Sequence, residues 1–140
     1  MTRFLDCSAP ATADELNALE NRVGVPLPLA LKRLFRDANG GRPTPSIFRD
    51  ERGSIDVSEC LAVRAGRGSV LWTYELLIES KAAAPRHYVP FAVDSGGNCF
   101  LVDCVSEDAQ VHLLLHDPAF RLCRLGVGLE EFLQRLTDLD

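Results

Sequence analysis

Three histidines, His87, His112 and His116, are the residues of this sequence best suited to metal binding or to proton transfer near neutral pH. His112 and His116 flank a run, 111–115, whose β-prone residues favour a strand over a helix. Two strand positions four residues apart are separated by about 13 Å, which is too far for both to bind one metal ion. His87 has no Cys or Asp at catalytic spacing. We therefore expect no metal site, no cofactor and no histidine-based catalysis.

A second chemically capable group, Asp94, Asn98 and Asp103, surrounds a turn rich in glycine. These side chains could bind a cation or take part in catalysis. Asp and Asn are also favoured in turns, because their side chains bond to nearby backbone groups. The turn is a weak match to a phosphate-binding loop, since no helix and no Lys follow it. No P-loop, dinucleotide fingerprint or nucleophile elbow is present. We interpret the turn as structural and predict that the protein is not an enzyme.

The elements that position this turn are two apolar runs, Tyr88–Val93 and 99–102, which predict a central β-hairpin. Gly97 and its neighbours can take a positive φ without a Cβ clash. Nearly every position in both runs is apolar, which indicates strands covered on both faces. Pro90 donates no ladder hydrogen bond, so we expect it at a bulge or an unpaired position.

Two helices are predicted before this hairpin. Thr12 and Glu15 form a capping-box pattern, and Gly24 ends the first helix. Pro28 suits the first position of the second helix, which 39–41 (Asn-Gly-Gly) should end. We expect the two helices to form a short antiparallel hairpin. Their apolar stripes are Leu16, Leu19 and Val23 in the first and Leu31, Leu34, Phe35 and Ala38 in the second.

Two further helices are predicted in the second half of the chain. Ser69 can cap one that runs from Val70 to about Ala83. Gly126 and Gly128 should break the chain before the last helix, whose apolar stripe extends from Leu129 to Leu136. Short strands are predicted at 46–48, 55–57, 60–63, 111–115 and 121–125.

Length and composition predict one globular domain, 1–140. The chain is 46% hydrophobic and 25% charged, and no apolar run approaches the ~20 residues of a membrane span. The residues after Met1 turn polar at once, unlike a signal peptide. Five cysteines, an odd number without a C-x-x-C pair, are most simply reduced thiols. We expect a soluble, cytoplasmic protein that binds no membrane.

The net charge of −5 is concentrated in the last third of the chain. Residues 1–43 carry 6 basic and 5 acidic side chains, 44–86 carry 6 and 6, and 87–140 carry 3 and 9. Such a surface repels nucleic acid and favours a cationic partner. The alternative is an acidic face that only keeps the protein soluble.

Four segments, in their order and spacing, resemble the SUKH superfamily, which includes a fungal regulator of cell-wall synthesis and many bacterial immunity proteins. They are Leu16-x-x-Leu19-Glu20-x-x-x-Gly24-x-x-Leu27-Pro28 continuing to Asn39-Gly40-Gly41, then Trp72-x-Tyr74, then Val89-Pro90-Phe91-Ala92-x-Asp94-x-Gly96-Gly97-Asn98, and finally Leu129-Glu130-Glu131-Phe132-Leu133.

The resemblance implies an α+β fold, with a mixed or antiparallel sheet flanked by about four helices and no catalytic centre. It also implies an immunity protein that binds and neutralises a cognate secreted toxin, often a nuclease or deaminase. The alternatives are a non-catalytic scaffold or regulatory module of the same fold, and an enzyme that uses the 94–98 turn. A protein partner is expected, with no nucleic acid and no small-molecule substrate. The candidate partner-binding residues are Asp50, Glu51, Asp103, Glu107, Asp108 and Asp117.

Overall fold

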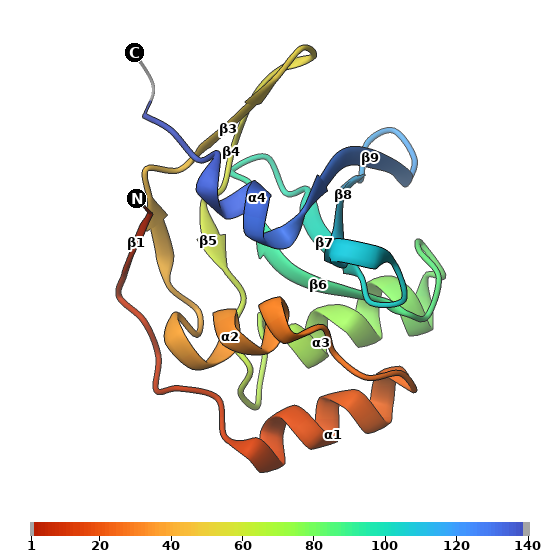
Figure 1. The fold of residues 1–140 in the computed structure, drawn as a ribbon. Coiled ribbons are helices and arrows are strands. Elements are labelled where there is room, and N and C mark those ends of the chain that lie inside the picture. The colour runs from red at the N-terminus through yellow and green to blue at the C-terminus, as the bar shows by residue number, and fades with distance from the viewer. Residues whose placement is uncertain (1, 139–140) are drawn as a thin grey trace.

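A computed structural model describes residues 2–138 as an α+β fold built on an antiparallel sheet (Figure 1). The sheet has the strand order β5-β6-β7-β8-β9, and each neighbouring pair is antiparallel. The fold class predicted from the sequence is therefore confirmed. The five strands are β5 Glu59–Cys60, β6 Tyr88–Val93, β7 Cys99–Asp103, β8 Gln110–Leu115 and β9 Arg121–Gly128.

Helices surround this sheet, and α4 lies across one of its faces (Figure 1). Phe132 of α4 stacks on Phe48 at 4.9 Å between ring centroids and contacts Phe91 and Phe100 of the sheet at 6.0 and 5.3 Å. All four rings are fully buried, so this aromatic cluster forms the centre of the core. The helices are α1 Ala13–Val23, α2 Leu29–Asp37, α3 Val70–Tyr74 and α4 Leu129–Gln134, with a 3₁₀ turn, η2, at Glu107–Ala109.

Two small two-stranded sheets complete the fold. One pairs β1 (Arg3–Leu5), which was not predicted from the sequence, with β2 (Arg42–Thr44). The other is a hairpin that joins β3 (Ile47–Asp50) to β4 (Gly53–Asp56), near the two positions where strands were predicted. No helix within residues 2–138 has the length and apolar character needed to cross a bilayer.

The local signals that the sequence carried most clearly are confirmed. Thr12 and Glu15 form both hydrogen bonds of a capping box, at 3.1 and 3.0 Å, and α1 ends at Gly24 with φ 87°. Gly97 has φ 89°, as expected for the turn of the central hairpin. The register of β6 against β7 shifts between Pro90 and Ala92, which is the bulge expected at that proline.

Three predicted elements were wrong in extent. The helix from Val70 is α-helical only to Tyr74 and continues as a π-helix, η1 (Glu75–Ser80), whose rare hydrogen-bond pattern residue propensities do not signal. The strand predicted at 60–63 pairs with the sheet only over Glu59–Cys60. Its remainder turns away, because the amide N of Val63 donates to the side chain of Asn39 at 2.7 Å.

The last strand is longer than predicted, because Gly126 and Gly128 lie inside β9 and do not break the chain. Gly126 has φ 81°, a conformation that glycine adopts without strain. Gly128 packs directly against the backbone of Asp108. The chain therefore passes from β9 into α4 at Leu129 with no intervening loop.

Candidate protein-binding groove

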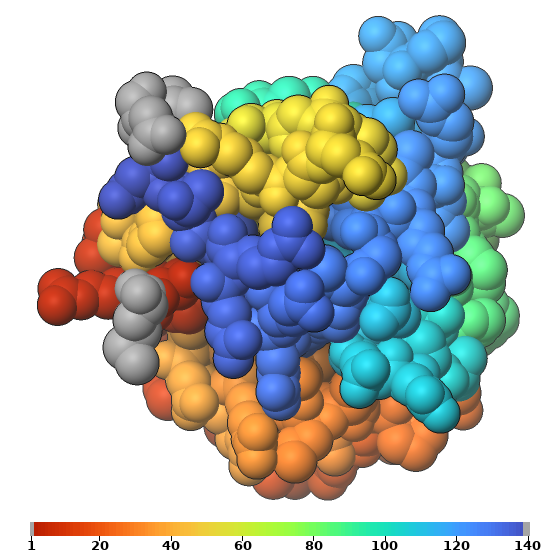
Figure 2. Space-filling view, turned by 45° about the horizontal axis from the view of Figure 1, so that its top comes forward, coloured from red at the N-terminus to blue at the C-terminus, as the bar shows by residue number. Residues whose placement is uncertain are grey.

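An open groove of about 1000 Å³ lies where the start of α2, the η2 turn, the end of β9 and the start of α4 meet. Figure 2 shows these segments around one region of the surface, with α2 in orange, η2 in cyan and α4 in blue. Leu27, Ala109 and Val127 are buried and give the groove an apolar floor, whereas Leu29 at its edge is 56% exposed. A groove with an apolar floor and an exposed apolar edge suits contact with a protein surface.

The charged lining of this groove is entirely acidic. Asp108 of η2 and Glu130 and Glu131 of α4 line it, and no Lys or Arg is among the lining residues. Arg33 lies 3.7 Å from Glu130 and Arg135 lies 3.4 Å from Glu131, but these pairs are on the exposed surface. The two arginines partly offset Glu130 and Glu131, but neither lines the groove, so the groove itself presents only carboxylates to a cationic partner.

A short network of hydrogen bonds holds the η2 turn at the edge of the groove. The Ser106 hydroxyl donates to the backbone oxygen of Asp103 at 2.7 Å and accepts from the backbone N of Gln110 at 2.9 Å. Asp108 has φ 61°, a left-handed conformation that Asp tolerates better than most residues. The exposed side chains of Glu107 and Asp108 are therefore presented by a backbone fixed on both sides.

Asp103, predicted as a partner-binding residue, faces its own chain. Its carboxylate accepts from the backbone N of Val105 at 3.1 Å and lies 3.4 Å from Nε2 of His87. It also adds to the effect of burial in raising the pKa of Tyr88. The side chain is only 17% exposed, so the structure places Asp103 beneath the η2 turn.

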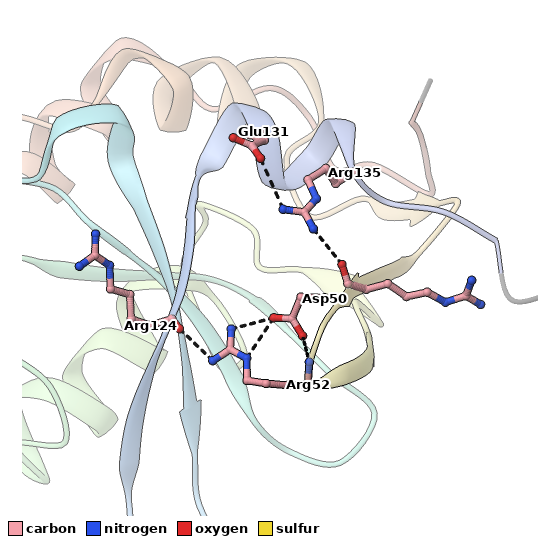
Figure 3. Close-up of polar contacts among 6 residues, drawn as sticks. Asp50, Arg52, Arg124, Glu131 and Arg135 are labelled. Atoms are coloured by element: carbon pink, nitrogen blue, oxygen red, sulfur yellow. Dashed lines mark hydrogen bonds and ion pairs between the residues drawn. The ribbon is translucent and has the colours of Figure 1, made fainter.

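Asp50 and Glu51 lie at the turn of the β3–β4 hairpin, away from the residues that line the groove. The carboxylate of Asp50 accepts from Nη2 of Arg52 at 2.7 Å, and this bond lowers the pKa of Asp50 (Figure 3). Arg52 in turn donates to the backbone oxygen of Arg124 in β9 at 3.0 Å. Asp50 therefore anchors the hairpin to the sheet, whereas Glu51 is exposed.

A second clamp holds the same hairpin from α4. The guanidinium of Arg135 donates to the backbone oxygen of Arg49 at 3.1 Å and lies 5.1 Å from the centre of the Phe48 ring (Figure 3). The same guanidinium also donates to the carboxylate of Glu131 at 3.4 Å. Arg135 therefore joins α4, which lines the groove, to β3. This clamp ties the position of α4 to the position of the hairpin.

Asp117 is exposed in the loop between β8 and β9. This loop and η2 are at opposite ends of β8, and Figure 2 shows them well apart, in lighter blue and cyan. Of the six residues predicted to bind a partner, the structure places Asp108 in the lining of the groove and Glu107 beside it on η2. It does not bring Asp50, Glu51 or Asp117 to them.

Sequence reasoning missed Glu130, Glu131 and Leu29 as candidate site residues. The two glutamates appear in the sequence analysis only as members of the 129–133 segment that resembles the SUKH superfamily. Leu29 lies outside the apolar stripe of its helix, and an apolar residue outside the stripe is a signal of exposure. That signal was readable in the sequence.

The 94–98 turn uses its polar groups internally. Asp94 Oδ1 accepts from the backbone N of Gly96 at 2.9 Å and of Asn98 at 2.8 Å, and Oδ2 accepts from the Asn98 amide at 2.9 Å. Nε2 of His116 lies 2.8 Å from the backbone oxygen of Gly96. These bonds explain the Asp and Asn residues as determinants of the turn.

Other groups with potential reactivity are buried or isolated. Burial raises the pKa of the Cys60 and Cys104 thiols to about 12, and Cys104 is the one that lines the groove. A thiol with such a pKa is a poor nucleophile at neutral pH. Burial lowers the pKa of His112, which favours its neutral form. Across residues 2–138, no three His, Cys, Asp or Glu side chains are grouped to hold a metal ion.

The antiparallel sheet, its flanking helices and the acid-lined groove describe an α+β domain with a surface suited to a protein partner. The chain belongs to the SMI1 / KNR4 family (SUKH-1), whose family model matches residues 10–135. The family resemblance seen in the sequence is therefore confirmed. No curated protein matches the chain.

Proposed function

We propose that this protein is an immunity protein, which binds a cognate secreted toxin in the cytoplasm of the bacterium that produces it and so neutralises the toxin. Family membership supports this class of function. The observation that carries the proposal is the groove, whose charged lining residues, Asp108, Glu130 and Glu131, are all acidic. A basic toxin surface is the complement of such a groove.

The proposed mechanism is occlusion by direct binding. A nuclease presents basic side chains to the phosphates of its substrate, and an acidic inhibitor that covers them blocks the substrate site. Carboxylates on η2 and at the start of α4 would meet these cations, while Leu29 and the apolar floor would exclude water from the contact. No chemical step is required of the immunity protein.

The test combines protection from the toxin with association kinetics. The partner to be tested is the C-terminal domain of any large secreted protein encoded beside this chain, and co-expression of the two should restore growth that this domain alone prevents. We expect the double variant Glu107→Lys/Asp108→Asn to associate about tenfold more slowly at low salt, because steering by complementary charge is weakened. At ~1 M salt, where the Debye length is about 3 Å, the variant and the wild type should converge.

The substitution at position 108 is chosen to suit the positive φ of the backbone there. Asn tolerates the φ of 61° at position 108, so the variant should fold normally. A matched control, Asp14→Lys/Glu59→Gln, changes the net charge by the same +3 (2 + 1) at exposed positions outside the groove. Equal rates for the two variants would contradict a groove-specific role. If no secreted toxin is encoded nearby, the scaffold or regulatory alternative is favoured.

A further inference from the structure

A second surface of the molecule, which shares no lining residue with the acidic groove, exposes large apolar side chains on α3 and η1. Trp72 is 38% exposed and Leu76, one helical turn later, is 37% exposed. Tyr74 lies between them and is fully buried, so the exposed side chains do not serve the core. Tryptophan is costly to leave in water and is enriched where proteins bind one another.

The loop before α3 places two arginines beside this tryptophan. The guanidinium of Arg67 lies 5.7 Å from the centre of the Trp72 ring, a cation–π contact that orients both groups. Arg64 donates to the backbone oxygens of Ala65 and Arg67 at 3.0 and 3.2 Å. These bonds hold the loop in one conformation, so a partner would meet a surface that is already formed.

The charge of this loop is not neutralised locally. Arg64 and Arg67 form no ion pair with a carboxylate of residues 2–138. The nearest acids along the helix, Glu75 and Glu79, are instead paired with Arg22 of α1, at 3.1 and 2.8 Å. Arg64 and Arg67 therefore lie beside Trp72 without an ion pair, whereas Glu75, which lines the same hollow, is held by Arg22.

The dimensions of the surface limit what it can bind. The hollow between Arg64, Arg67 and Trp72 has a volume of about 180 Å³. Small-molecule sites usually enclose about 300–1,000 Å³, so this hollow suits one side chain of a larger partner. Two arginines would contact only about two phosphates of a nucleic acid, which is few for stable binding. A protein segment fits better.

We propose that the Arg64, Arg67, Trp72 and Leu76 surface, which we call the tryptophan patch, docks an acidic protein segment that also carries an apolar side chain. The carboxylates of that segment pair with the two arginines, and its apolar side chain packs on Trp72 and Leu76. The patch and the groove have opposite charge and share no residue. Docking at the patch therefore does not depend on whether the groove binds a toxin.

The test uses Trp72 as its own reporter, because it is the single tryptophan of the chain. The full chain is titrated with a short synthetic peptide of glutamate and leucine, with its lysine-for-glutamate counterpart and with oligothymidylate. We expect the acidic peptide alone to shift the tryptophan emission. Arg67→Glu should weaken its binding by about tenfold or more, as at other interface hot spots, and Arg67→Lys by less. Arg36→Glu, at an exposed arginine of α2, is the matched control and should bind normally.

Three outcomes would overturn the proposal. One is an unchanged emission with the acidic peptide up to about 1 mM. Another is binding of oligothymidylate in place of the peptide, which would make the patch a nucleic-acid site. The third is an emission that depends on protein concentration without peptide, which would mean that a second copy of the chain covers the patch. Glu130→Gln/Glu131→Gln in the groove should leave peptide binding at the tryptophan patch intact. A loss of peptide binding at the patch can therefore be told apart from a loss of toxin binding at the groove.

Discussion

Alanine at position 128 tests directly whether the groove depends on the close approach of two backbone segments. A Cβ at Gly128 would lie 2.1 Å from the backbone oxygen of Asp108 and 3.0 Å from its Cβ. A backbone oxygen cannot rotate away, so the η2 turn must move. Gly128 has φ −78° and ψ 169°, which alanine adopts easily, and the cost is therefore steric alone.

Forcing an extra methyl group into a packed region costs about 1–3 kcal/mol. Alanine recovers roughly 0.4–1 kcal/mol by restricting the unfolded chain, which, taken from the middle of that range, about 2 kcal/mol, leaves a net loss of about 1–2 kcal/mol. In a domain of this size each kcal/mol lowers Tm by about 3–4 °C, so Gly128→Ala should melt roughly 3–8 °C below the wild type. Thermal unfolding followed by circular dichroism measures this difference.

The matched control for this variant is Gly24→Ala, in which the backbone conformation, and not a steric overlap, opposes the alanine. Gly24 has φ 87°, but a Cβ added there would meet no atom within 4 Å, so its cost is conformational, about 1 kcal/mol. Only Gly128→Ala should also displace Asp108 and slow partner association at temperatures where the variant is folded. A Gly128→Ala protein with the melting temperature and association rate of the wild type would refute the argument that glycine is needed there.

Three further predictions concern the central turn and one partly exposed carboxylate. Gly97→Val should lose about 1–3 kcal/mol, because φ is 89° and the added Cβ would lie 3.1 Å from Nε2 of His116; an unchanged urea midpoint would count against this. Asp94→Ala/Asn98→Ala should weaken the fold by about 2 kcal/mol but abolish no turnover, and a substrate whose conversion stops while the variant stays folded would make the protein an enzyme. Glu20 accepts from the backbone N of Leu27 at 2.7 Å and lies 3.1 Å from Lys32, and both contacts lower its pKa. Its stabilising effect is therefore full above the ordinary glutamate pKa of about 4.3 and is lost as pH falls through the lower folded value. Glu20→Gln should cost about 1–2 kcal/mol at pH 7 and progressively less in acid, and a pH-independent difference would contradict this.

The parts of the fold that could be predicted are those determined by neighbouring residues. The capping box at Thr12 and Glu15 is a local pair of hydrogen bonds, and Gly97 and Pro90 act through their own backbone conformations. Such signals do not depend on what packs against the segment. The sequence therefore located α1, the central hairpin and its bulge correctly.

The elements that could not be predicted depend on distant contacts. Gly128 was predicted to break the chain before the last helix. Its lack of a side chain instead makes room for the backbone of Asp108, twenty residues earlier in the chain. The strand β1 is paired only because the chain returns at β2 nearly forty residues later. In both cases the relevant partner is far away in sequence, so no local pattern reports it.

The candidate groove shows how the same distinction applies to function. The excess of acid in the last third of the chain was visible in the sequence, but a charge excess does not specify a surface. The antiparallel pairing of β8 and β9 supplies the missing step, because it sets Gln110 opposite Gly128. The residues just before Gln110 then lie beside those just after Gly128, and Asp108 lines the same groove as Glu130 and Glu131. Asp117 is at the far end of the same hairpin and is directed elsewhere. The pairing of two strands, and not the proximity of charges in the sequence, therefore decides which carboxylates act together.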